Sequence, residues 1–221
     1  VRQGRGIYDN LRKAMSYVLA VHVAIVGVAI FPLFNPDWPL VLLPLQLALL
    51  ELVIDPACSI VFEAEGHDPN LMNMPPRKPD EPLFSRGRIA ISALQGLAVL
   101  TAVAAVYAWA MSSDRGADVV RSLTFGTLVL SNLGLILVNR SWRLSVLHTF
   151  KERKNSTMWW LLGVVTVVLV ALLSVPGMRM ALDFGAVAPS DLAIPVVAAV
   201  VSVAWFEVYK ALRWRTVSRR Q

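Results

Sequence analysis

The sequence predicts an all-α membrane protein, a bundle of about six transmembrane helices with both termini in the cytoplasm. Three observations lead to this fold class. Of the 221 residues, 56% are hydrophobic, 16% are charged and the mean hydropathy is +0.59, whereas soluble domains are about half apolar and about a quarter charged. The apolar residues form six runs, each close to the roughly 20 residues that cross a bilayer. Lysine and arginine gather in alternate connections between these runs.

The first two apolar runs end at breaks that no continuous helix would tolerate. Residues 1–13 are polar and predict a cytoplasmic stalk that leads into a first span over about 14–34. That span ends at the Asn-Pro-Asp-Trp-Pro cluster of residues 35–39, because proline cannot continue a helix and restricts the residue before it. A second span over about 40–62 precedes a proline-rich, charged loop, 63–88.

The remaining runs predict four further spans, which cover about 89–111, 119–138, 158–175 and 192–208. A short polar turn joins the third span to the fourth, and a basic loop, 139–157, joins the fourth to the fifth. The chain ends in a basic tail, 209–221. We therefore expect one transmembrane domain over 14–208, with cytoplasmic loops at 63–88 and 139–157.

The distribution of basic residues indicates the orientation. The stalk, the two long loops and the tail are rich in lysine and arginine, whereas the other connections hold only Arg115, Arg121 and Arg179. Cytoplasmic loops carry an excess of these residues. This explains the net charge of +6 without a nucleic-acid partner, and we expect none. The single cysteine, Cys58, excludes an internal disulfide.

Two carboxylates lie within the second apolar run. Glu51 and Asp55 are four residues apart, so on a helix they share one face, one turn apart. A carboxylate at membrane depth costs about 2.5–3.5 kcal/mol on insertion scales. Pro56 follows directly and leaves the Leu52 carbonyl without its helical partner. This arrangement predicts that the two carboxylates face the bundle interior and meet a cation or protons there. The alternative is a buried pair of acids that hydroxyls, amides or water satisfy.

Three stretches resemble P-type cation-transporting ATPases of the calcium-pump type. GRGIYDNLRKAMSYVL, Gly4–Leu19, resembles the stalk that enters the fifth membrane helix. QLALLELVIDPACS, Gln46–Ser59, resembles the sixth helix. DPNLMNMPPRKPDEPLFSRG, Asp68–Gly87, resembles the loop between helices six and seven. The three patterns occur in order, so the chain resembles helices five to ten, the carboxy-terminal membrane half of such a pump.

The resemblance implies positions in an ion site. Where calcium-type pumps have an asparagine and an acid on the fifth helix, this chain has His22 and Ile25. The sixth-helix positions are Glu51, Ile54 and Asp55. The aspartate is kept, the central amide is an acid, and the second site's acid and threonine are absent. This predicts one bound ion, shared with a fourth-helix acid outside this chain. An acid at the Glu51 position also occurs in sodium/potassium and proton/potassium pumps, so a monovalent ion stays an alternative.

The eighth helix of such pumps supplies an acid, where this chain offers only the polar pair Ser131 and Asn132. We therefore include Asn132 with Glu51, Asp55 and His22 as candidate metal-site residues. His22 has two interpretations: a satisfied core histidine, or a group that titrates near the carboxylates as ions move.

The resemblance also implies cofactors and partners. The transported cation is Ca²⁺ or another ion, and ATP and Mg²⁺ belong to domains that this chain lacks, since it contains no D-K-T-G-T acceptor motif or P-loop. The partners are the amino-terminal half of the same pump, with its actuator, phosphorylation and nucleotide domains and helices one to four, and the lipid bilayer. The polar opening without an initiating methionine predicts a segment of a longer protein, in a bacterial-type plasma membrane.

Two interpretations from other functional classes stay open. One is a stand-alone multipass scaffold or regulatory protein, and the other is a small secondary carrier in which the acid pair couples to protons. Secondary carriers often contain inverted repeats, and the sequence shows none. Three acids near span ends have simpler interpretations. Glu63 and Glu65 are both expected at the solvated exit of the second span, and Glu207 is expected to pair with Lys210 at i, i+3.

Overall fold

The structure, a computed structural model, describes residues 1–56, 60–66, 72, 85–142, 146 and 156–218, with side chains described as far as Leu212. Within these ranges the chain folds into helices and contains no strand. Five of the helices are long and apolar enough to cross a membrane. The protein is therefore an integral, multipass, all-helical membrane protein, as the sequence predicts.

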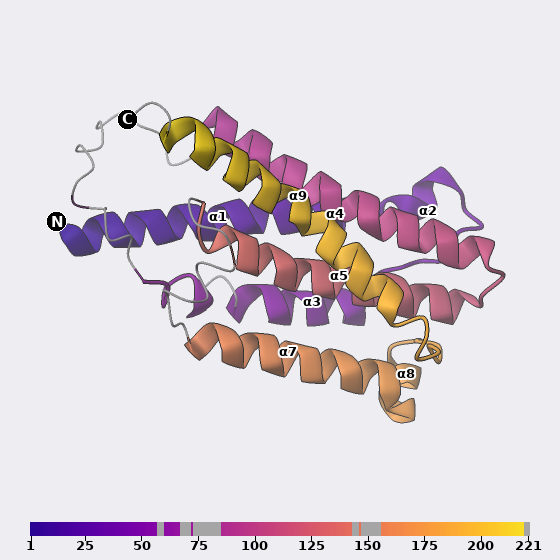
Figure 1. Cartoon of the computed structure of the whole chain (residues 1–221). Coiled ribbons are helices and arrows are strands. Elements are labelled where there is room, and N and C mark those ends of the chain that lie inside the picture. The colour runs from indigo at the N-terminus through magenta and orange to yellow at the C-terminus, as the bar shows by residue number, and fades with distance from the viewer. Residues whose placement is uncertain (57–59, 67–71, 73–84, 143–145, 147–155, 219–221) are drawn as a thin grey trace.

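Four long helices form the core of the bundle (Figure 1). They are α1 (Arg2–Ala29), α4 (Arg86–Ser112), α5 (Ala117–Asn139) and α9 (Ala193–Ser218). The central helix is α5, which packs against the other three and buries residues on nearly all of its faces. A helix that is apolar and buried all round is the usual centre of a helical membrane bundle.

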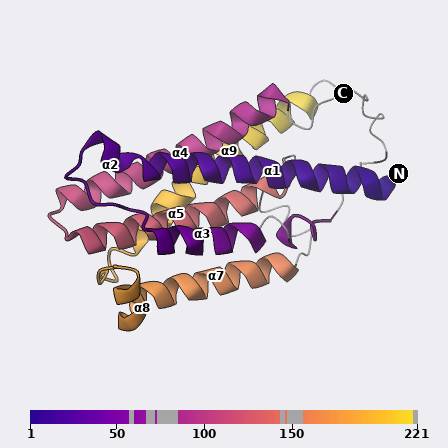
Figure 2. The same ribbon diagram turned by 180° about the vertical axis from the view of Figure 1, so that it is seen from behind.

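Two further helices lie along one side of this core, and two short ones lie at its far end (Figures 1 and 2). The side helices are α3 (Pro44–Pro56) and α7 (Ser156–Ser174), and the short ones are α2 (Phe31–Phe34) and α8 (Pro176–Ala181). The chain enters through α1 and leaves through α9 at the same end of the bundle, which we call the stalk end. The opposite end we call the far end.

The described part of the second apolar run includes one helix, α3, over Pro44–Pro56. The helix begins at Pro44, some residues later than the expected span, because the fixed φ angle of proline suits the first turn of a helix. Pro56 is the last residue described before the gap at 57–59, and residues 60–61 form a short π-helical stretch.

A close approach between α1 and α4 depends on Gly96. A Cβ atom at this position would lie 2.4 Å from the Ala20 carbonyl oxygen and 2.7 Å from Cβ of Val23. Small residues allow the backbones of membrane helices to approach in this way.

We expect Gly96→Ala to destabilise the protein by about 1–3 kcal/mol, because the added methyl group overpacks the α1–α4 contact. Gly163 on α7 is a matched control, since nothing lies within 4 Å of a Cβ built there. Gly163→Ala should leave stability unchanged or raise it by up to about 1 kcal/mol. Thermal unfolding in one detergent measures both, and equal shifts for the two variants would contradict the prediction.

Candidate cation site

Glu51 and Asp55 lie one turn apart on α3, as the spacing predicts. The buried stripe of this helix, which includes Leu50 and Ile54, packs towards the bundle core. Glu51 is half-buried and Asp55 is exposed. Asp55 therefore does not face the interior of the described bundle, although the sequence predicted this for the pair, and the described part of this chain covers this face of α3 only in part.

The structure places His22 and Asn132 in different surroundings. His22 is exposed on α1, and its Nδ1 lies 2.8 Å from the carbonyl oxygen of Val18, one turn earlier. Asn132 lies in the interior on α5, with 0% exposure. Among the described residues, no group of three or more His, Cys, Asp or Glu side chains comes close enough to hold a metal ion. This chain therefore does not gather His22 with the two carboxylates into a complete site.

The amide of Asn132 has no hydrogen-bond partner at either its nitrogen or its oxygen. A buried polar group left unsatisfied costs about 1–3 kcal/mol. Asn132 follows Phe125 and Val129 along one face of α5 at helical spacing. Those two residues line an apolar cavity of about 400 Å³ between α3, α5 and α7. The unsatisfied amide is therefore on the side of α5 that faces this cavity, and the α3 side chains that line the cavity do not include Glu51 or Asp55.

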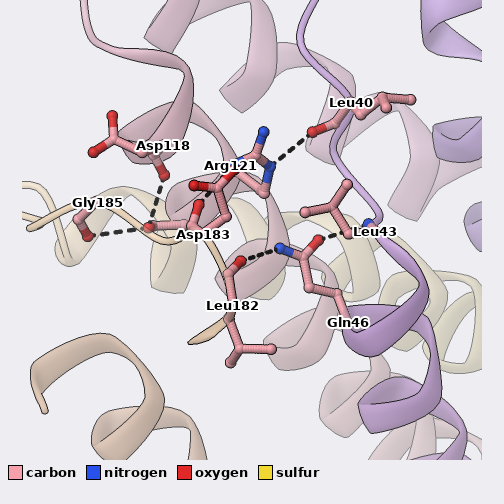
Figure 3. A network of polar contacts seen from close by, with 9 residues as sticks. Leu40, Leu43, Gln46, Asp118, Arg121, Leu182, Asp183 and Gly185 are labelled. Atoms are coloured by element: carbon pink, nitrogen blue, oxygen red, sulfur yellow. Dashed lines mark hydrogen bonds and ion pairs between the residues drawn. The ribbon is translucent and has the colours of Figure 1, made fainter. Parts of the chain in front are cut away.

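The far end of α3 is held by a polar cluster, which we call the Arg121 clamp (Figure 3). The Arg121 guanidinium donates to the Leu40 carbonyl at 2.9 Å, and to the carbonyl and carboxylate of Asp183 at 2.6 and 2.5 Å. Gln46, in the first turn of α3, donates to the Leu182 carbonyl at 2.7 Å and accepts from the Leu43 amide at 2.9 Å.

The loop over residues 182–185, which supplies Leu182 and Asp183 to this clamp, also binds the start of α5. The Gly185 amide donates to the Asp118 carbonyl, and the Ser122 hydroxyl donates to the Gly185 carbonyl. A Cβ at Gly185 would lie 2.6 Å from an Asp118 carboxylate oxygen, so glycine permits this contact. The clamp residues are Leu40, Leu43, Gln46, Arg121, Leu182 and Asp183.

A second cluster, the Arg140 clamp, lies at the stalk end and consists of Asn10, Glu65 and Arg140. Arg140 donates from Nε and Nη2 to the two carboxylate oxygens of Glu65, at 2.7 and 3.3 Å. The Arg140 and Glu65 side chains are 1% and 0% exposed. Asn10, on α1, donates to the Glu65 carbonyl at 2.9 Å. Three segments that are distant in sequence therefore meet at Glu65.

The expectation that Glu65 lies at a solvated helix exit is wrong. Its carboxylate is buried because Arg140, from the end of α5, supplies a two-pronged partner. Nothing in the sequence around Arg140, beyond its place in a basic loop, predicted that it would form a buried ion pair. Arg121 was detectable in principle, since an arginine inside an apolar run marks a paired, interior position. The expected pair of Glu207 with Lys210 is confirmed, at 2.5 Å.

Comparison with known proteins agrees with this architecture. A family model described as "Cation transporting ATPase, C-terminus" matches residues 39–212. The chain belongs to this family. The match confirms the expected carboxy-terminal region of a P-type cation ATPase, and relatives named cation-transporting or calcium-transporting ATPases agree with it.

Three relatives of this cation ATPase region illustrate how much of each protein it covers. "Probable cation-transporting ATPase F" of Mycobacterium tuberculosis is 25% identical over 201 residues, 88% of this chain and 21% of that protein. "Calcium-transporting ATPase 1" of Lactococcus lactis is 26% identical over 163 residues, 74% of this chain and 17% of that protein. "Calcium-transporting ATPase" of Bacillus subtilis is 31% identical over 137 residues, which are 60% of this chain and 15% of that protein. The matched region is thus about a fifth or less of each relative's length.

Proposed function

We propose that this chain forms part of the ion-binding site of an ATP-driven P-type cation pump, and that the site holds one divalent cation such as Ca²⁺. The observation that carries the proposal is the pair Glu51 and Asp55, one turn apart beside Pro56, on a face of α3 that the described part of this chain covers only in part. A membrane carboxylate pair is a functional site by default. Relatives named calcium-transporting ATPases favour Ca²⁺ among the divalent cations.

The ligand chemistry fits a hard cation but is incomplete in this chain. Ca²⁺ takes six to eight oxygen ligands, which carboxylates, amide oxygens, main-chain carbonyls and water supply. Glu51 and Asp55 provide carboxylates, and the unpartnered oxygen of Asn132 provides an amide ligand from the facing helix. The remaining ligands would come from helices one to four of the pump, which would cover the exposed face of α3.

The other parts of the proposal follow from the same assignment. Phosphoryl transfer needs an acceptor aspartate with Mg²⁺ and a nucleotide site, so ATP and Mg²⁺ would bind the actuator, phosphorylation and nucleotide domains of the amino-terminal half. His22, which is exposed on α1, would meet the ion path only where that half of the pump covers it. The pump would lie in a bacterial plasma membrane, with the lipid bilayer as its surroundings and no nucleic-acid partner.

A cation panel tests this function on the intact pump that contains the chain. We expect ATP-dependent phosphorylation and vesicle uptake to require Ca²⁺ or a similar divalent cation, with Na⁺, K⁺ and protons unable to replace it. A requirement for Na⁺ or K⁺ would instead favour the monovalent alternative that the acid at Glu51 suggests. Absence of both ATP-dependent phosphorylation and uptake with every cation tested would support the scaffold interpretation, since a scaffold has no phosphate-accepting domain, and would exclude the pump.

A further inference from the structure

The central helix α5 carries an arginine at each end. Arg121 lies near its start and Arg140 is its C-terminal capping residue. The two are 19 positions apart, which is about 28 Å of helix at 1.5 Å per residue. This length is close to the roughly 30 Å thickness of the hydrocarbon core. The two guanidinium groups therefore lie at opposite boundaries of the bundle's apolar layer.

Each arginine binds a segment that flanks α3. Arg121 donates to the carbonyl of Leu40, just before α3, and to Asp183 in the loop that also binds Gln46. Arg140 holds the carboxylate of Glu65, nine residues beyond Pro56. The same helix thus holds the chain on both sides of α3.

Between these two points α3 has little support from the described chain. Three of its residues are buried: Gln46, Leu50 and Ile54. Pro56 also weakens this helix, because proline removes a main-chain hydrogen bond and clashes with the turn before it. The position of α3 along and around the bundle therefore depends strongly on its two polar attachments.

We propose that α5 is a brace and that Arg121 and Arg140 are positioning residues that fix α3 so that Glu51 and Asp55 can bind a cation. This inference rests on the proposed cation site. The two arginines do not touch the ion. They act through the main chain and the carboxylate of segments continuous with α3.

Arginine suits this role for physical reasons. Its guanidinium is charged at every relevant pH and presents a planar fork that binds two oxygens in a fixed geometry. Arg140 uses that fork on both oxygens of Glu65, and Arg121 binds two different segments at once. Lysine offers a single point charge and would fix one partner less rigidly.

Substitutions in the intact pump test the brace, with two assays compared. The variants are Arg121→Gln, Arg140→Gln and the corresponding lysine variants. Arg115→Gln is the matched control, because Arg115 forms an ion pair with Asp191 near the far end and lies over the Trp109 ring, both outside α3 and its flanking segments. One assay is the Ca²⁺ concentration that gives half-maximal phosphorylation from ATP. The other is phosphorylation from inorganic phosphate without Ca²⁺, which needs a folded pump but no occupied cation site.

We expect the glutamine variants to raise the half-maximal Ca²⁺ concentration by about tenfold or more, because a small displacement of ligands weakens a preorganised site. Phosphorylation from inorganic phosphate should stay within about twofold, the lysine variants should recover part of the loss, and Arg115→Gln should behave as the parent protein. Unchanged Ca²⁺ dependence in the glutamine variants, or equal losses in both assays, would overturn the brace.

Two further variants keep the test decisive. If Arg140→Gln fails to fold, the double variant Glu65→Gln/Arg140→Gln replaces it in the test, because it leaves no unpaired charge buried. Arg121→Gln can be tested as it is, because its partner Asp183 is largely exposed. Asp55→Asn separates this inference from the proposed function. If Asp55→Asn loses Ca²⁺ dependence while the arginine variants keep it, the brace alone is overturned. If Asp55→Asn keeps Ca²⁺ dependence, the cation site itself is overturned and the brace with it.

Discussion

Replacing Asp55 with asparagine is expected to raise the cation concentration needed for phosphorylation of the intact pump by at least about a hundredfold. The amide keeps the size of the side chain and loses its negative charge. At a ligand distance of about 2.4 Å and an effective dielectric constant near 20, attraction between one charge and a divalent cation is on the order of 10 kcal/mol, much of which is offset by the cost of dehydrating both ions. Each 1.4 kcal/mol corresponds to about tenfold in affinity. The measurement is phosphorylation from ATP against cation concentration.

Glu63→Gln is the control for this prediction. Glu63 is an exposed carboxylate just beyond α3, so its removal changes the net charge by the same amount without touching the proposed site. We expect its cation dependence to match that of the parent protein. An Asp55→Asn pump with normal uptake and normal affinity would remove Asp55 from the site.

The second large effect is expected at the buried pair of Arg140 and Glu65. Arg140→Met should lower the free energy of unfolding by about 3–5 kcal/mol, because it leaves the carboxylate of Glu65 buried without its charged partner. The double variant Glu65→Leu/Arg140→Met should recover most of this loss, since apolar pairs often replace buried ion pairs at little cost. The free energy of unfolding in detergent is measured for the parent protein, the single variant and the double variant.

A double-mutant cycle completes this experiment. The pair is 1% and 0% exposed, so its interaction energy should far exceed the 0–1 kcal/mol typical of surface pairs. The pair of Lys13 with Asp9, of which Asp9 is one-third exposed, supplies a comparison on α1. Additive losses at Glu65 and Arg140 would show that the two side chains do not stabilise each other.

The fold class could be predicted because it depends on local properties of the sequence. Runs of apolar residues and the proline breaks between them determine which segments form membrane helices. The spacing of Glu51 and Asp55 likewise requires only that the segment be helical, and α3 includes both. Assignment of these residues to an ion site stays a prediction, because the cation and the covering helices lie outside this chain.

The clamps could not be predicted, because they join residues that are far apart in sequence. Glu65 and Arg140 are separated by 75 positions, and either one alone has the pattern of a charged residue at a helix end. Their burial arises only when α3 and α5 are packed side by side. The burial of Asn132 could not be predicted either, because an asparagine in an apolar run can form a hydrogen bond to a neighbouring helix or serve as an ion ligand.

The start of α3 at Pro44 has a consequence for the segment before it. Residues 39–43 are not helical, so most of their main-chain groups lack helical partners; the Leu43 carbonyl, which accepts from the Leu47 amide, is the exception. Side chains of three different helices meet those groups: Tyr107 donates to the Pro39 carbonyl, Arg121 to that of Leu40, and Gln46 accepts from the Leu43 amide. Hydrocarbon can offer no such bonds. In every state that the protein adopts, this stretch must stay enclosed by protein or open to water, and lipid tails must be kept away from it.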